Sequence, residues 1–74
     1  MDSRRDPLSL AGRVAVVTGA GRGIGAATAR LFAEAGAQVA LLDLNGAGVT
    51  HTAEEIALAG GEALSFETDI TDAF

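Results

Sequence analysis

The sequence predicts an α/β fold with a parallel sheet, and three observations lead to this prediction. Short, continuous apolar runs recur along the chain, which is typical of strands that are buried on both faces of a parallel sheet. Residues at the spacing of a helix follow each of the first two runs. Glycine-containing turns separate the segments. The expected order is β-α-β-α-β, which is one half of a doubly wound sheet with the usual strand order 3-2-1-4-5-6.

The first strand and the first helix are expected on either side of a glycine-rich turn. Residues 14–17 form the first apolar run, and the turn covers residues 19–25. The residues that then recur at helical spacing are Ile24, Ala27, Thr28, Leu31, Phe32 and Ala35. Arg30 and Glu34 are expected on the opposite face as an ion pair four residues apart, and Gly36 is expected to end the helix.

Two further apolar runs predict the second and third strands. Residues 39–42 form a strand that ends at Asp43, and residues 63–66 form a strand that leads to Asp69. Thr71 is placed to cap another helix. Only strands 3, 2 and 1 of the doubly wound order are then present, so the edge of the first strand is left bare. Because a bare apolar edge promotes aggregation, the chain is expected to be cut rather than complete.

A second helix is expected between these two strands. Asn45 is placed to cap it, and it should run to about Ala59, although Gly46 and Gly48 weaken its first turn. The residues expected to face inward are Val49, Ala53, Ile56 and Ala57. The residues expected on a solvated face are Glu54 and Glu55.

Composition limits the classes of function. The chain has 74 residues, no cysteine and one histidine, so disulfides are excluded and a structural zinc site is not expected. A core of this size is marginal. Every basic residue is an arginine and the net charge is −5, which argues against a nucleic-acid partner. The hydrophobic fraction of 49% is typical of a globular protein.

Residues 1–9 are polar, charged and broken by Pro7, and they are interpreted as a loose leader. Ser3-Arg4-Arg5 faintly resembles a twin-arginine export signal. Such a signal needs an apolar stretch behind it, and Gly12 and Arg13 interrupt the one that follows. No apolar run approaches the roughly 20 residues of a membrane span. We therefore expect a cytoplasmic protein without a membrane partner.

The glycine-rich turn carries the main functional signal. Glycines permit a tight turn and close approach of a pyrophosphate to backbone N–H groups, and the helix that follows offers free N–H donors and the positive end of its dipole. Spacing alone leaves two registers open: Gly21, Gly23 and Ala26, or Gly19, Gly23 and Gly25. The position between a predicted strand and a predicted helix favours a Rossmann-type dinucleotide site over a glycine-rich turn without a ligand.

Asp43 is the second signal. It lies at the end of the second strand, about twenty residues beyond the turn, where an acidic side chain accepts hydrogen bonds from the adenosine ribose. The 2′-phosphate of NADP would meet this carboxylate and be repelled, which favours NAD. Arg22 points the other way, because an arginine in the turn can pair with a 2′-phosphate. The plain alternative is that Asp43 caps the next helix.

Two other polar residues receive weaker interpretations. Asp69 lies on the same carboxyl edge of the predicted sheet and is placed to accept from the adenine amino group, although a cap or turn aspartate fits the spacing nearly as well. His51 lies in the second predicted helix without a nucleophile or carboxylate arranged around it, and it is interpreted as a surface residue.

These residues together resemble the opening of short-chain dehydrogenases/reductases. The run Thr18-Gly19-Ala20-Gly21-Arg22-Gly23-Ile24-Gly25 resembles the family's T-G-x-x-x-G-x-G motif, which selects the register Gly19, Gly23, Gly25. Asp43-Leu44 resembles the NAD-selecting end of the second strand, and Asp69-Ile70-Thr71-Asp72 resembles the segment whose first two residues flank adenine. The implied cofactor site comprises Gly19, Gly21, Arg22, Gly23, Ile24, Gly25, Asp43, Leu44, Asp69 and Ile70, with NAD as the cofactor and NADP less favoured.

The resemblance also implies what this chain lacks. Family members are several times longer, and their catalytic Ser and Tyr-x-x-x-Lys pair lie downstream of anything present here; the chain has no tyrosine and no lysine. Residues 10–74 are thus expected to be the N-terminal half of an NAD(P)-binding Rossmann domain with no catalytic residue and no metal site. The longer parent is expected to be a homo-oligomer that moves a hydride between nicotinamide and an alcohol or ketone. The alternative is a non-catalytic nucleotide-binding module or gene remnant.

Overall fold

Five elements follow one another in the predicted order. The computed structural model describes residues 9–69, so the expectations for residues 1–8, Ile70 and Thr71 lie outside the described residues. The elements are β1 (Val14–Thr18), α1 (Gly23–Glu34), β2 (Gln38–Asp43), α2 (Gly46–Leu58) and β3 (Glu62–Glu67). Within residues 9–69, no helix has the length and apolarity needed to span a membrane.

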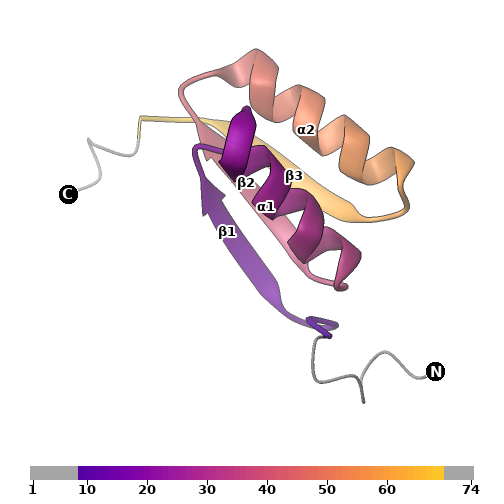
Figure 1. Cartoon of the computed structure of the whole chain (residues 1–74). Coiled ribbons are helices and arrows are strands. Elements are labelled where there is room, and N and C mark those ends of the chain that lie inside the picture. The colour runs from indigo at the N-terminus through magenta and orange to yellow at the C-terminus, as the bar shows by residue number, and fades with distance from the viewer. Residues whose placement is uncertain (1–8, 70–74) are drawn as a thin grey trace.

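The three strands form one parallel sheet with β2 in the centre, between β1 and β3. Thr18 pairs with Leu42, and Asp43 pairs with Glu67, so the carboxyl ends of all three strands lie along one edge. The turn after β1 and the segments after β2 and β3 therefore meet at that edge (Figure 1). The Rossmann-type β-α-β-α-β half predicted from the sequence is confirmed.

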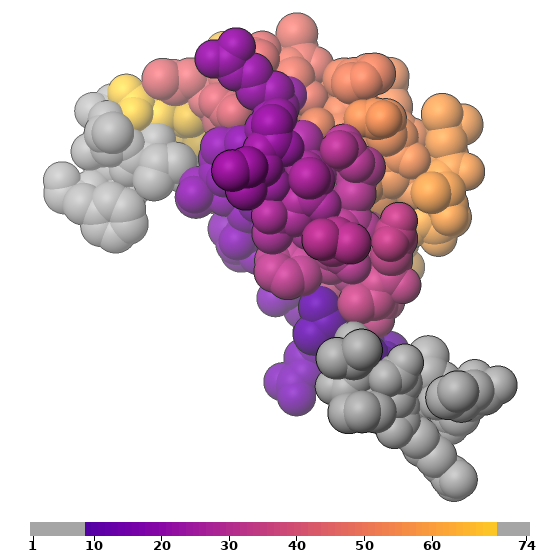
Figure 2. All heavy atoms as spheres, viewed as in Figure 1, coloured from indigo at the N-terminus to yellow at the C-terminus, as the bar shows by residue number. Residues whose placement is uncertain are grey.

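Both helices lie on the same face of the sheet and pack side by side (Figures 1 and 2). The core fills the space between them and the strands. Its most buried side chains come from every layer: Leu41 and Val39 on β2, Ala29 on α1, and Val49 and Ile56 on α2. The small size of Ala29 lets α1 approach the sheet closely, and burial of the larger apolar groups supplies most of the stabilisation.

The prediction for the first helix was wrong in two respects. Ile24 and Leu31, which belong to the predicted apolar stripe, are 87% and 64% exposed, whereas Ala26 and Ala29 are buried. Phe32 of the predicted stripe packs against the core together with Ala29 and Ala33, so the buried face of the helix is rotated from the predicted one. Arg30 does not pair with Glu34; its guanidinium reaches Glu55 of α2, at 3.3 Å.

The second helix begins and ends close to the predicted positions. The Asn45 side chain caps it and accepts the N–H of Gly48 at 3.0 Å. Val49 and Ile56 are buried as expected, and Thr52, which was not predicted, is buried between them. Ala57 was predicted to face inward and is exposed, because it lies one position, about 100°, round the helix from the buried Ile56.

The sheet has one covered face and one open face among the described residues. The prediction of strands buried on both faces is therefore not met by the side chains that point away from the helices. Val14 and Val16 of β1 are 68% and 63% exposed, and Leu64 and Phe66 of β3 are 67% and 47% exposed. Within residues 9–69, the chain supplies helices to one face only.

Candidate dinucleotide-binding site

The turn between β1 and α1 has the backbone geometry of a tight glycine turn. Gly19 and Gly23 have φ angles of +64° and +61°, a region that side chains with a Cβ rarely adopt. A Cβ at Gly25 would overlap the carbonyl oxygen of Gly19, so α1 passes close to the turn only because this position is glycine. The three positions at which this geometry requires glycine are thus those of the family motif, Gly19, Gly23 and Gly25.

The amino end of α1 opens directly behind this turn. Its N-cap residue, Arg22, has an extended backbone and makes no side-chain capping hydrogen bond, and the first turn holds no acidic residue. The leading N–H groups of a helix have no partner inside the helix, and they carry the positive end of its dipole. Among the described residues, no capping side chain occupies this end, which suits it to an anion.

Asp43 lies against the turn, at the end of β2. Its Oδ2 accepts the N–H of Gly21 at 2.9 Å, and its Oδ1 accepts the N–H of Asn45 at 3.1 Å. A Cβ at Gly21 would come within 2.7 Å of Oδ2, so glycine is also needed here for the approach of the carboxylate. The turn and the end of β2 are therefore one connected structure.

The same contacts set the charge of the carboxyl group. Hydrogen bonds from the N–H groups of Asn45 and Gly21 hold the pKa of Asp43 below its usual value. Desolvation opposes them, and the N–H of Leu44 and the positive charge of Arg22 add to the lowering. The group is thus a carboxylate at neutral pH. The side chain of Asn45, and not that of Asp43, caps α2 by accepting the N–H of Gly48.

The remaining predicted residues lie around this edge. Arg22 and Ile24 are exposed at the amino end of α1, and Leu44 is 65% exposed beside Asp43. Asp69 is half-buried and follows by two residues the end of β3, the strand that neighbours β2. Ile70 lies outside the described residues. The structure therefore brings the turn and Asp43 into contact and places Asp69 at the next strand end.

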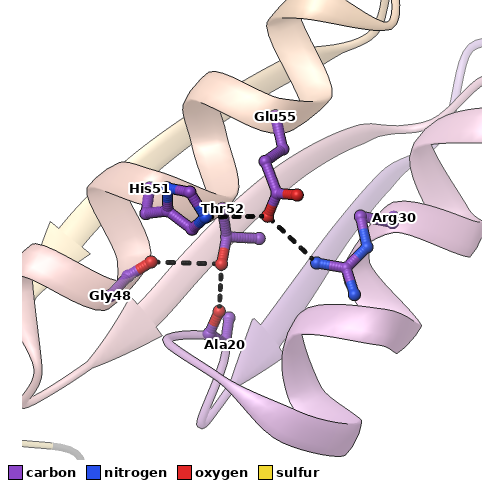
Figure 3. A network of polar contacts seen from close by, with 6 residues as sticks. All are labelled: Ala20, Arg30, Gly48, His51, Thr52 and Glu55. Carbon is purple, nitrogen blue, oxygen red and sulfur yellow. Dashed lines mark hydrogen bonds and ion pairs between the residues drawn. The ribbon is translucent and has the colours of Figure 1, made fainter.

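Sequence reasoning missed Thr52. Its side chain is buried, and its hydroxyl donates to the carbonyl oxygen of Ala20, in the middle of the glycine turn, at 2.9 Å (Figure 3). The signal was available in the spacing, because Val49, Thr52 and Ile56 follow one another at helical intervals and so share a face. A threonine on a buried helical face needs a hydrogen-bond partner, and the turn provides one.

His51 lies outside this cluster, in a polar network between α1 and α2. Its Nε2 is 3.4 Å from Oε1 of Glu55, which also contacts Arg30, and its side chain is 72% exposed (Figure 3). The prediction of a surface histidine is confirmed. Among the described residues, no group of three or more potential metal ligands gathers.

Comparison with known proteins gives a consistent family. Residues 13–73 match the model of the family described as short chain dehydrogenase. The chain is 50% identical over 64 residues to 2,5-dichloro-2,5-cyclohexadiene-1,4-diol dehydrogenase LinX of Sphingobium indicum, covering 86% of this chain and 26% of that protein. The described fold matches 7α-hydroxysteroid dehydrogenase complexed with NADH and 7-oxo glycochenodeoxycholic acid, with a TM-score of 0.85 and 45% identity over 86% of this chain and 25% of that one.

A second solved structure carries the phosphorylated cofactor. A metagenomic short-chain oxidoreductase in complex with NADP matches with a TM-score of 0.78 and 50% identity, covering 81% of this chain and 27% of that one. The chain thus spans about a quarter of the length of the relatives it matches.

Proposed function

The chain belongs to the short-chain dehydrogenase/reductase family, and we propose that it forms the part of an NAD(P)-dependent oxidoreductase that holds the adenosine end of the cofactor. One observation carries this proposal. An uncapped helix end stands behind a tight glycine turn, and an ionised carboxylate is hydrogen-bonded to the same turn. The first feature suits a pyrophosphate and the second suits ribose hydroxyls.

The proposal assigns roles in binding to the glycine turn and to the ends of the second and third strands. Gly19, Gly23 and Gly25 allow the pyrophosphate to reach the backbone N–H groups of the turn and of α1. The Asp43 carboxylate accepts from the ribose, beside Leu44. Asp69 and Ile70 flank the adenine. When bound, the nicotinamide supplies or accepts the hydride; the residues of this chain orient the opposite end of the molecule.

We infer that the chemistry itself belongs to residues outside this chain. The whole protein would transfer a hydride between nicotinamide and the carbon of an alcohol or ketone, as a homo-oligomer in the cytoplasm. No residue of the 74 is proposed as catalytic, since the chain contains neither tyrosine nor lysine. The names of its relatives support alcohols and ketones on rings as the first compounds to try.

NAD is proposed as the preferred cofactor over NADP. Asp43 is charged and is held at the strand end by Gly21 and Asn45, so a 2′-phosphate placed there would meet a fixed negative charge. Arg22 supports the competing preference, because its positive charge acts on the same carboxylate and would attract a 2′-phosphate. Asp43 favours NAD and Arg22 favours NADP. We expect the effect of Asp43 to be the larger one, because hydrogen bonds hold its carboxylate in place.

The second candidate function is nucleotide binding without catalysis. It is favoured by one observation, the lack of tyrosine and lysine in a chain whose described part still builds the turn and Asp43. It differs from the first proposal in a single measurable respect, because it predicts binding of NAD without any turnover.

Calorimetry and a hydride-transfer assay on the intact native protein test both proposals. Saturable binding of NAD, weaker binding of NADP, and reduction of NAD with a cyclic secondary alcohol are expected. Binding without turnover across a panel of alcohols and ketones would favour the second candidate. A folded protein that binds neither dinucleotide would overturn both.

A further inference from the structure

One peptide group of the glycine turn is held at both of its polar ends. The carbonyl oxygen of Ala20 accepts from the Thr52 hydroxyl at 2.9 Å, and the N–H of Gly21, in the same peptide group, donates to Oδ2 of Asp43 at 2.9 Å. The first bond comes from α2 and the second from the end of β2. Figure 3 shows Thr52 between Ala20 and the preceding turn of its own helix.

The Thr52 hydroxyl has two acceptors within reach. Ala20 O lies at 2.9 Å, and Gly48 O, one turn back in α2, lies at 3.1 Å. A hydroxyl has a single hydrogen, and the Gly48 carbonyl can already accept the backbone N–H of Thr52 within the helix. Ala20 is fully buried, so its carbonyl oxygen is the group for which loss of a donor is costly. The hydroxyl therefore serves mainly the turn.

Backbone contacts from α2 and β2 hold the glycine turn in addition to the Thr52 hydrogen bond. A Cβ at Gly48 would come within 2.5 Å of the carbonyl oxygen of Gly21, so α2 touches the turn along its backbone as well as through Thr52. The N–H of Ala20 donates to the carbonyl oxygen of Leu42, at 3.3 Å, which ties the turn to β2. Rotation of the Ala20–Gly21 peptide group would break the bonds to Thr52 and to Asp43 together.

From this geometry we propose that Thr52 is a positioning residue for the dinucleotide site, acting through the Ala20–Gly21 peptide group on the Asp43 carboxylate. Donation to the carbonyl polarises the amide and strengthens its N–H as a donor, so the Thr52 bond tightens the hold of Gly21 on Asp43. The inference rests on the proposed function, in which Asp43 and the turn bind the cofactor.

Two pairs of variants in the intact protein isolate the hydroxyl. Thr52→Val replaces the hydroxyl with a methyl group and is compared with wild type, and Thr52→Ala is compared with Thr52→Ser, which differs from it by the hydroxyl alone. Thr28→Val is the matched control, because Thr28 is half-buried on α1 and its hydroxyl makes no hydrogen bond in the described part of the chain.

Loss of the hydroxyl is expected to weaken NAD binding with little effect on turnover. The dissociation constant for NAD, measured by calorimetry, should rise about fivefold in Thr52→Val and in Thr52→Ala relative to its serine partner. The kcat at saturating cofactor should stay within about twofold of wild type, since the hydroxyl is remote from the reacting atoms. The pKa of Asp43, followed by carboxyl carbon NMR, should rise toward its usual value in the same two variants only.

The outcomes separate this inference from the proposed function. If wild type binds NAD and all Thr52 variants bind it as Thr28→Val does, with an unchanged Asp43 pKa, Thr52 is merely a core residue and the inference is overturned. If Thr52→Val does not fold, the alanine and serine pair still gives the comparison. If folded wild-type protein binds no dinucleotide, the proposed function itself fails.

Discussion

At the scale of single residues, the site depends on how one carboxylate is held. Asp43 accepts N–H groups from both sides, from Gly21 of the turn and from Asn45 at the start of α2. These bonds fix the position of the carboxylate and keep it ionised. A fixed charge discriminates better than a mobile one, because it cannot move away from a phosphate placed beside it.

Asp43→Ala in the intact protein is expected to weaken NAD binding and to reduce the ratio by which NAD is bound more tightly than NADP. Under the proposed function, the change removes both an acceptor for the ribose hydroxyls and the negative charge that a 2′-phosphate would meet. The ratio of the two dissociation constants, measured by calorimetry, tests this. An unchanged ratio would show that another residue selects the cofactor, with Arg22 the first to examine.

The lowered pKa of Asp43 also predicts how stability depends on pH. The carboxyl group binds its proton less readily in the folded protein than in the unfolded chain, so its ionised form stabilises the fold above about pH 4, and this contribution is lost as the pH falls through the lower folded pKa. The difference in thermal midpoint between wild type and Asp43→Asn should be largest near neutral pH and shrink in acid. A difference that is constant with pH would contradict the shift.

At the scale of elements, α2 begins with a sequence that is poor for a helix and depends on its cap. Gly46 and Gly48 both lie in its first turn, where glycine is unfavourable. The Asn45 side chain compensates by accepting the N–H of Gly48. Gly48 and Thr52, in the first two turns of α2, also contact the glycine turn after β1. The start of α2 therefore stabilises the candidate site as well as the helix.

Asn45→Ala is expected to lower the free energy of unfolding by roughly 0.5–2 kcal/mol, the usual cost of losing an N-cap side chain. Asn45→Asp is the matched control, because its carboxylate can accept the same N–H and favours the amino end of a helix. Chemical denaturation of the three proteins measures the effect. If the free energy of unfolding fell equally in both variants, the Asn45 amide would stabilise the protein in some way other than by capping α2.

At the scale of the whole molecule, the two faces of the sheet differ sharply. One face is covered by both helices (Figure 1). The other presents apolar side chains from neighbouring strands. Val16, Ala40 and Leu64 lie in one row across the sheet, and Leu42 and Phe66 lie in the next. A contiguous apolar surface of this kind favours association in water.

Residues 1–74 produced alone are therefore expected to self-associate and to bind a dye that reports exposed apolar surface. The double substitution Val16→Thr and Leu64→Lys should reduce both, since it places polar groups in the middle of the open face. Leu58→Lys adds the same charge at the exposed end of α2, away from this face, and serves as the control. Light scattering and dye fluorescence give the readings; an equal effect of the control would mean that net charge, and not the open face, governs association.

Much of the fold and part of the site could be predicted from the sequence. Apolar runs and helical spacing identified all five elements, because burial imposes a different period on strands and helices. The glycine turn and Asp43 were predicted as parts of one site because a dinucleotide requires particular residue types at a particular place in a β-α-β unit, and the structure brings the two into contact. The face of α1 that packs on the sheet was assigned correctly only in part: Phe32 packs against the core, whereas Ile24 and Leu31 are exposed, because several apolar stripes of this alanine-rich helix fit the same period.

What the sequence by itself determined is the order of strand, turn and helix and the residues that can stand at the carboxyl edge of the sheet, because these depend on local backbone preferences and on the period of burial. The tertiary structure alone decided which distant groups meet. Arg30 pairs with Glu55 rather than Glu34, and Thr52 reaches Ala20 across 32 residues of chain. Such contacts arise only when α2 packs beside the glycine turn, and no local pattern records that distance.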